Sequence, residues 1–157
     1  ASKLDLDKAK EELSDEYIFI VKYHYLVSDK IDWTPYKGFV YTFDETKDIA
    51  WLYLVSDMLI TDYSSVMFDY SILNRPMLFF AYDLEDYKEN LRGFYFDFVN
   101  DIPGPISRDT DQLIKDIKEY NEDSWKEKYK NYHDKFNGID DGHASQKVID
   151  VIKKVSR

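Results

Sequence analysis

The sequence contains no cysteine, which excludes disulfide bonds, thiolate metal sites and a cysteine nucleophile. It also has no apolar run approaching the roughly 20 residues that a membrane-spanning helix needs. The longest such stretch, residues 52–60, is interrupted by Ser56 and Asp57. Residues 1–10 alternate charges where a secretory signal would present an apolar run. These absences predict a cytoplasmic protein, or the cytoplasmic part of one.

Glycine is scarce, with five residues, and neither G-x-G-x-x-G nor G-x-x-x-x-G-K-[ST] occurs. Those glycines allow the backbone to approach phosphates closely, so a dinucleotide-dependent dehydrogenase and a P-loop NTPase are disfavoured. The chain lacks H-x-x-x-H and EF-hand spacing, and it therefore predicts no metal site. The 21 basic residues are outnumbered by 31 acidic ones, giving a net charge of −10. Without a basic stripe, nucleic acid is not expected as a partner.

What the chain does have is apolar surface for a core, since 44% of its residues are hydrophobic and 17% aromatic. Short apolar runs at residues 17–22, 39–43, 58–61 and 77–81 predict strands, the first of them buried on both faces. Helical spacing predicts helices near residues 4–14, 44–55, 66–73, 83–90, 109–120, 123–136 and 142–155. The second of these is opened by Asp44 and carries Ile49, Leu52, Tyr53 and Val55 on its apolar face; the last carries Ala144, Val148, Ile149, Val151 and Ile152.

Strands that alternate with helices predict an α/β fold with a doubly wound parallel sheet, helices on both faces and right-handed crossovers. In such sheets, ligands bind outside the carboxyl ends of the strands. That rule selects His24, residues 62–65 and residues 81–83 as site candidates.

The segment Thr61-Asp62-Tyr63-Ser64-Ser65 joins a predicted strand to a predicted helix. Free N–H groups at a helix start, the positive end of the helix dipole and two hydroxyls together favour an anion, and a phosphate would fit. The alternative is that Ser64 or Ser65 is simply the N-cap, with help from Asp62.

Two further side chains could act on a phosphorylated ligand. His24 follows a strand, where its imidazole could donate to a phosphate oxygen or act as an acid or base, or could instead bond a loop carbonyl. Arg92 could clamp a diphosphate, or could pair with Asp97.

The chain resembles the C-terminal half of the CDP-glycerol glycerophosphotransferases, the teichoic acid primases and polymerases of Gram-positive bacteria. The resemblance extends over residues 17–155 and is carried by Ser56-Asp57-Met58-Leu59-Ile60-Thr61-Asp62-Tyr63-Ser64-Ser65-Val66-Met67-Phe68-Asp69, Arg75-Pro76-Met77, Leu91-Arg92-Gly93-Phe94-Tyr95-Phe96-Asp97, Pro103-Gly104-Pro105 and Asp141-Gly142-x-Ala144-Ser145. It implies the Rossmann-like C-terminal domain of a glycosyltransferase-B type fold.

The activity that the resemblance implies is transfer of glycerol phosphate, or ribitol phosphate in relatives, from a CDP-alditol to a teichoic-acid-type polymer, with release of CMP. It places His24 near the donor diphosphate as the catalytic residue, and Ser64 and Ser65 against the donor phosphates. We expect Asp62 and Arg92 in the same donor phosphate-binding set; Arg92 lies in a family motif. CDP-glycerol is expected as the donor substrate, with no tightly bound cofactor.

The family enzymes are longer than this chain. Residues 1–157 are therefore expected to be a single CDP-alditol-binding domain, a fragment without the N-terminal acceptor domain, which alone binds donor without catalysing transfer. The polymer acceptor would be reached through the full-length enzyme. We expect that enzyme at the inner face of the cell membrane, with membrane contact only through the missing half, since a net charge of −10 is repelled by an anionic leaflet.

Other classes were weighed on the same residues. The donor half of a nucleotide-sugar glycosyltransferase would share the anion-binding helix but prefer a UDP- or GDP-sugar. A receiver-like signalling domain with Asp62 as phosphate acceptor needs acids after the first strand, where Lys22 and His24 stand. A non-catalytic α/β interaction domain would fold without binding a nucleotide.

Overall fold

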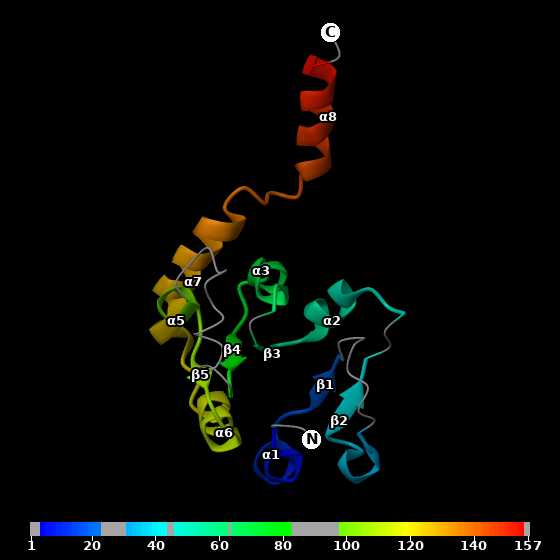
Figure 1. Cartoon of the computed structure of the whole chain (residues 1–157), viewed down its shortest axis with the longest axis vertical. Coiled ribbons are helices and arrows are strands. Elements are labelled where there is room, and N and C mark those ends of the chain that lie inside the picture. Colours follow the sequence, from blue (N-terminus) through cyan, green and yellow to red (C-terminus); the bar gives the residue numbers. More distant parts are fainter. Residues whose placement is uncertain (1–3, 23–30, 44–45, 63, 83–97, 156–157) are drawn as a thin grey trace.

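The computed structural model describes residues 4–22, 31–43, 46–62, 64–82 and 98–155 (Figure 1). Within them, helices and strands alternate as predicted. The strands are β1 (Phe19–Val21), β2 (Val40–Thr42), β3 (Leu59–Thr61), β4 (Met77–Phe80) and β5 (Ile106–Ser107). The helices are α1 (Leu6–Leu13), α2 (Ile49–Val55), α3 (Val66–Ser71), α5 (Phe98–Asp101), α6 (Thr110–Lys118), α7 (Glu122–Asn137) and α8 (Ala144–Val155), with a 3₁₀ turn η1 (Thr34–Tyr36).

All strand pairs in the described chain are parallel, which confirms the predicted α/β class. β1 pairs with β2, and β3, β4 and β5 form a second sheet in that order. The sequence predicted one sheet, whereas the described strands hydrogen-bond as two. Short strands explain the difference, because elements of two to four residues form few ladder bonds and depend on side-chain packing to stay together.

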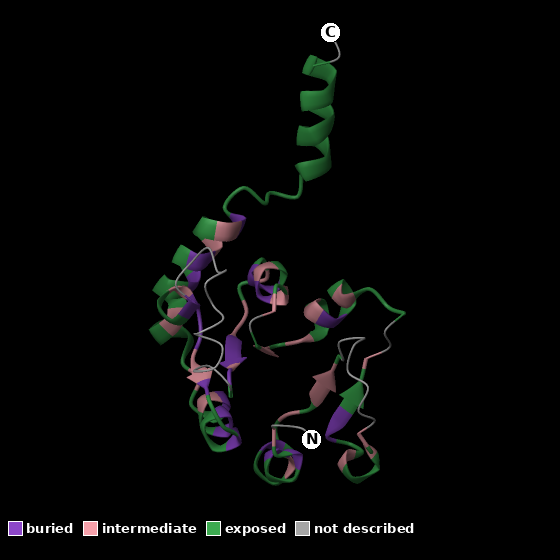
Figure 2. Cartoon of the chain, viewed as in Figure 1, coloured by how far each residue is buried: buried purple, intermediate pink, exposed green. Residues whose placement is uncertain are grey.

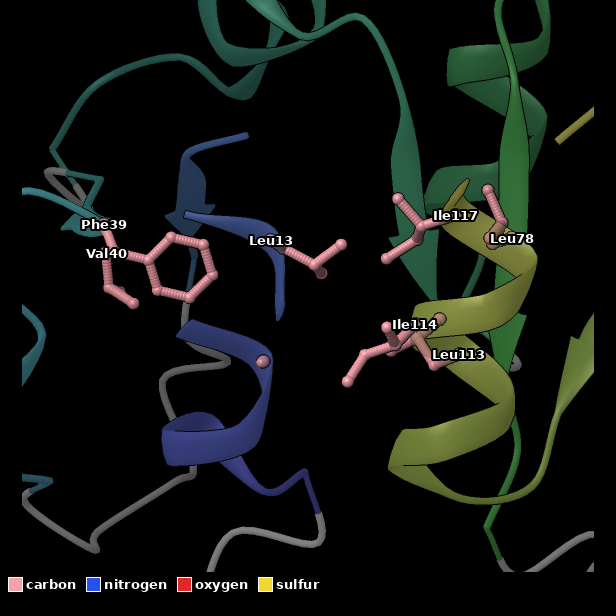
Figure 3. Packing of buried hydrophobic residues seen from close by; sticks show 8 residues of the cluster. Leu13, Phe39, Val40, Leu78, Leu113, Ile114 and Ile117 are labelled. Atoms are coloured by element: carbon pink, nitrogen blue, oxygen red, sulfur yellow. The ribbon is translucent and has the colours of Figure 1, made fainter. Parts of the chain in front are cut away.

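One face of the sheets is covered by α1 and α6 (Figure 3). The core on this face joins residues from both sheets and both helices: Ala9, Leu13, Phe39, Val40, Leu78, Leu113, Ile114 and Ile117. The two helices are also tied at their starts, where the Asp5 N–H donates to the Thr110 hydroxyl at 2.9 Å. This shared core is what holds the two short sheets in one body.

The opposite face is covered by α3, α5 and α7, which form a more aromatic core (Figure 2). Its buried members are Met67, Tyr70, Met77, Phe79, Phe98, Ile102, Tyr129 and Tyr132. β4 serves both cores, since Met77 and Phe79 point to this side and Leu78 to the other. Helices therefore lie on both faces, as a doubly wound fold requires.

The segment before β5 reaches β4 through a glycine. A Cβ on Gly104 would lie 1.8 Å from the carbonyl oxygen of Met77, so only glycine allows this approach. Next to it, the Phe79 N–H donates to the Pro105 carbonyl at 2.9 Å. Sequence reasoning correctly excluded regular structure from residues 103–105, but it missed β5 and α5 on either side of them.

Four sequence predictions about individual elements were wrong. α2 begins at Ile49 after the Asp48 cap, not at Asp44, because the Asp48 carboxylate accepts from the Ala50 N–H at 2.9 Å. Val55 is 65% exposed and so does not share the buried face of α2. β1 is only half-buried, since it has one described partner strand. Every residue of α8 is exposed (Figure 2).

The prediction of no membrane-spanning segment concerns helices. Among the residues that the structure describes, no helix has the length and apolar character to cross a bilayer.

Candidate functional site

The turn between β3 and α3 holds three of the predicted site residues. Asp62 directly follows β3 and is exposed. Ser64 is half-buried and Ser65 is exposed, immediately before α3; Tyr63 lies outside the described residues. Because β3 is parallel to β4, this turn lies at the carboxyl edge of the three-stranded sheet. The structure therefore puts Asp62, Ser64 and Ser65 together where α/β folds bind ligands.

The two serines do not act as a side-chain cap. Ser65 occupies the N-cap position of α3 with a helical backbone (φ −61°, ψ −14°), and its hydroxyl makes no capping hydrogen bond. A capping serine is instead extended and accepts from an N–H two or three residues on. The helix start is closed by backbone bonds, from the Met67 N–H to the Ser64 carbonyl (3.3 Å) and from the Phe68 N–H to the Ser65 carbonyl (3.0 Å). The serine hydroxyls are thus not used by the helix itself.

The other predicted site residues fall where the structure makes no statement. His24 lies in residues 23–30 and Arg92 in residues 83–97, both outside the described ranges, so their roles stay predictions. At the candidate edge 81–83, Ala81 is buried and its N–H donates to the Ser107 carbonyl at 2.9 Å. Tyr82 is 49% exposed and packs near Phe80, with ring centroids 5.9 Å apart.

The carbonyl of Ser56 fixes the approach to β3. It accepts from the Tyr70 hydroxyl at 3.0 Å and from the Arg75 guanidinium at 2.7 Å. The same guanidinium nitrogen also bonds the carbonyls of Tyr53 (3.3 Å) and Leu54 (2.9 Å) at the end of α2. A helix end leaves carbonyls without intrahelical partners, and a cation there satisfies them. Arg75 and Tyr70 therefore tie α2, α3 and the start of β4 around the strand that leads to the site.

The far end of α3 is held by a buried polar clamp from α7. The Asn137 side chain, 4% exposed, donates to the Phe68 carbonyl at 2.7 Å and to the Ser71 hydroxyl at 2.6 Å. The Ser71 hydroxyl, also fully buried, donates to the same Phe68 carbonyl at 2.7 Å. Hydrogen bonds in a dry core fix geometry, because a broken one leaves polar atoms without water. The clamp holds the short helix whose start carries Ser64 and Ser65.

Sequence reasoning missed both of these supports. It assigned Asn74-Arg75-Pro76 only the role of ending a helix, and it placed Asn137 just beyond the predicted helix 123–136. The carbonyls that Arg75 bonds lie 19 to 22 residues earlier in the chain, and those that Asn137 reaches lie 66 to 69 residues earlier. No local spacing signals such partners.

Two tyrosines beside α3 stay protonated at neutral pH. Burial raises the pKa of Tyr70 to about 12, with the nearby Asp57 carboxylate adding to the shift and Arg75 opposing it. Burial also raises the pKa of Tyr53 to about 12, helped by Asp69 and Asp48. A phenol with such a pKa donates hydrogen bonds and does not act as a base near pH 7. Of the described turn residues, only Asp62 has a side chain that is ionised at that pH.

No group of three or more His, Asp or Glu side chains that could hold a metal gathers within the described part of the chain. What the described turn offers is a helix start with two unused hydroxyls. Such a group suits an anionic ligand held by hydrogen-bond donors.

Comparison with known proteins matches this region as part of a larger whole. The model of the family described as CDP-Glycerol:Poly(glycerophosphate) glycerophosphotransferase matches residues 1–154. The teichoic acid poly(glycerol phosphate) polymerase of Bacillus subtilis (strain 168) is 46% identical over 153 residues, which cover 96% of this chain and 20% of that protein. The teichoic acid glycerol-phosphate transferase of Staphylococcus aureus is 41% identical, over 96% of this chain and 39% of that protein.

Solved structures give the same result. The wall teichoic acid polymerase TagF matches 98% of this chain with a TM-score of 0.88 at 43% identity, and the match covers 38% of that chain. A variant of TagF soaked with CDPG matches 97% of this chain with a TM-score of 0.85. The chain therefore spans about a fifth to two fifths of the length of these relatives.

Proposed function

Because the chain belongs to the CDP-glycerol:poly(glycerophosphate) glycerophosphotransferase family, we propose that it is the donor-binding domain of an enzyme that transfers glycerol phosphate from CDP-glycerol to a teichoic-acid-type polymer. Relatives named as teichoic acid polymerases and a glycerol-phosphate transferase support the reaction class. A solved relative soaked with CDPG, the abbreviation of CDP-glycerol, supports the donor. Residues 1–157 act as one domain of that longer enzyme.

The single observation that carries the donor site is the pair of hydroxyls left unused at the start of α3. Ser64 and Ser65 donate to oxygens of the donor diphosphate, and the N–H groups and dipole of the helix start add to them. Asp62 lies in the same turn, but an ionised carboxylate repels a phosphate oxygen. It therefore contacts the donor through a hydroxyl group next to the diphosphate.

The reaction is an in-line displacement at phosphorus. An acceptor hydroxyl attacks the phosphorus that carries glycerol, a new O–P bond forms, and the bond to the bridging oxygen breaks, so that CMP leaves with that oxygen. The acceptor's proton goes to a base outside this chain. Charge grows on the CMP phosphate, where His24, Arg92 and the serines stabilise it; donors preorganised in this way often supply the largest part of catalysis.

The location of the enzyme follows the same division of labour. The net charge of −10 on this chain disfavours direct contact with an anionic leaflet. We place the full-length enzyme at the inner face of the cell membrane, with membrane and polymer contacts made by the part outside this chain. The chain alone binds CDP-glycerol and does not transfer glycerol phosphate.

The test of the donor site is the double substitution Ser64→Ala/Ser65→Ala in the full-length enzyme, followed by CMP release at varied CDP-glycerol concentration. We expect kcat/KM to fall on the order of 10²-fold or more, the usual effect of removing an oxyanion donor. Ser124→Ala is the matched control, because Ser124 is exposed in the first turn of α7. A double variant that unfolds like the parent and keeps its kcat/KM would remove these serines from the site.

The donor itself is tested by thermal unfolding of this chain with CDP-glycerol or with UDP-N-acetylglucosamine. A ligand at about 100 times its Kd stabilises a protein by roughly 2.7 kcal/mol. We expect stabilisation by CDP-glycerol alone. Stabilisation by the UDP-sugar alone would instead support the donor half of a nucleotide-sugar glycosyltransferase.

A further inference from the structure

Helix α8 presents an apolar stripe to solvent. Val148, Val151 and Val155 recur at helical spacing with Ile149 beside them, and they are 58%, 59%, 82% and 43% exposed. Three lysines and one aspartate lie among the remaining positions of this 12-residue helix. The pattern is that of a surface helix whose apolar face meets a core, yet all of α8 is exposed (Figure 2).

An apolar stripe of this kind is costly to leave in water. Soluble monomers rarely expose contiguous apolar patches of several hundred Å², and larger ones mark interaction sites. A 12-residue helix is also marginal without tertiary packing, more so when it is rich in β-branched residues. The helix therefore needs a covering surface that the described chain does not supply.

The junction before α8 directs the helix away from the body (Figure 1). Gly142 adopts φ +77°, a conformation that other residues rarely take. The Asp141 carboxylate accepts from the His143 N–H at 3.0 Å and pairs with the Lys147 ammonium at 2.9 Å. Lys147 also donates to the Ile139 carbonyl at 3.2 Å. These bonds set the direction in which α8 leaves α7.

We propose that the apolar stripe of α8 docks onto an apolar surface of the same enzyme that lies outside this chain. Relatives are about 2.5 to 5 times longer than the part that this chain matches, so most of the enzyme is available to cover the helix. TagF matches 98% of this chain with a TM-score of 0.88. The match must include most of α8, because a helix of 12 residues exceeds the unmatched remainder. The projecting helix thus keeps its place in a chain that is much longer.

A second copy of the chain is a poorer occupant. Paired helices in a coiled coil need the apolar repeat to continue over three to four heptads, and α8 provides less than two. A membrane surface also fits less well. Helices that lie on bilayers carry Trp, Phe or Leu on the apolar face, whereas this stripe contains only Val and Ile, which pack well in protein cores.

The inference rests on family membership and the exposed stripe, and not on the assignment of the donor site. It gives α8 the role of joining the donor-binding domain to the remainder of the enzyme. The test can therefore fail while the donor proposal holds, and the reverse.

The experiment introduces one cysteine at a time into the full-length enzyme, which is simple because this chain has none of its own. Val151→Cys tests the stripe, and Lys154→Cys is the matched control on the polar face. Each variant is labelled with a maleimide under native conditions and again in denaturant, after subtraction of the parent's labelling. We expect native labelling of Val151→Cys to be slower than that of Lys154→Cys by about tenfold or more, and equal labelling in denaturant.

Three outcomes would overturn the proposal. Equal native labelling of the two variants would show that the stripe stays exposed. Protection of Val151→Cys that disappears on dilution would identify a second copy as the occupant. Protection that appears only with phosphatidylglycerol vesicles would identify a membrane. As an independent measurement, Val151→Asn should lower the unfolding temperature of the full-length enzyme, and Lys154→Asn should leave it unchanged.

Discussion

The last two helices of the chain differ in the opposite sense to their composition. A quarter of the residues in α7 are apolar, yet Tyr129, Tyr132 and Asn137 are buried against α3. Half of the residues in α8 are apolar, and all of them are exposed. Burial therefore follows from the surface that is available to a helix, and not from the helix alone. In this chain α7 has its partner, and α8 lacks one.

The difference separates two tasks. α7 holds α3, and through it the turn with Ser64 and Ser65, so the donor site is fixed within the chain. α8 makes no comparable contribution to either core among the described residues. The four predictions below test that division.

The largest difference is expected from truncating one apolar side chain on each helix. Tyr132→Ala should lower the free energy of unfolding of this chain by about 3–5 kcal/mol, because Tyr132 is 1% exposed among aromatic rings. Val151→Ala on α8 should change it by less than about 0.5 kcal/mol. Urea unfolding of both variants measures this. Similar losses would mean that α8 packs on the body.

The polar clamp should matter nearly as much. Asn137→Ala removes the donor to the Phe68 carbonyl and the Ser71 hydroxyl, and should lower the free energy of unfolding by about 2–3 kcal/mol. Asn131→Ala is the control on the same helix, since Asn131 is exposed. It should change stability by no more than a few tenths of a kcal/mol. If the two variants unfold at the same urea concentration, α7 does not hold α3 through Asn137.

Alkaline pH should weaken the α3 side of the fold specifically. The pKa of Tyr70 is raised to about 12 by burial, against 10 in the unfolded chain. Between pH 10 and 12 the folded state therefore binds more protons, so stability falls as pH rises. At pH 11 the loss from this group is about 1 kcal/mol.

Denaturant unfolding at pH 8 and pH 11 gives the measurement. Tyr70→Phe should show a smaller difference between the two values than the parent. Tyr41→Phe, at a half-exposed position, should behave like the parent. An unchanged difference in Tyr70→Phe would assign the alkaline loss to other groups.

The smallest effect has the opposite sign. The Tyr132 hydroxyl is buried and has no hydrogen-bond partner within the described residues. Burying a hydroxyl without a partner is unfavourable, so Tyr132→Phe should raise the free energy of unfolding by up to about 1 kcal/mol. Thermal unfolding at pH 7 would detect the gain. A loss of stability would reveal a partner for this hydroxyl.

Much of the architecture could be predicted from local pattern. The helical spacing over residues 109–120 corresponds to α6, which Asp109 caps through the Gln112 N–H at 2.9 Å. The run Met58-Leu59-Ile60-Thr61 and the following serines placed β3, the turn and α3. The elements that were missed, α5 and β5, are four and two residues long. Periodicity has no meaning over so few residues.

For the candidate site, the sequence identified the turn, because hydroxyl residues between a strand and a helix form a local pattern. It did not identify Arg75 or Asn137 as supports, because their partners are distant in the chain. The roles of His24 and Arg92 stay predictions, since both lie outside the described residues.

The sequence by itself determined which segments are helix or strand, since backbone propensity and apolar spacing act over a few residues. It also determined the family, because the order of the motifs is a property of the chain. Only the tertiary structure decided which apolar faces are buried. The stripe of α8 satisfies the same helical pattern as that of α6, but burial needs a complementary surface, and that surface is formed by residues far away in the chain or outside it.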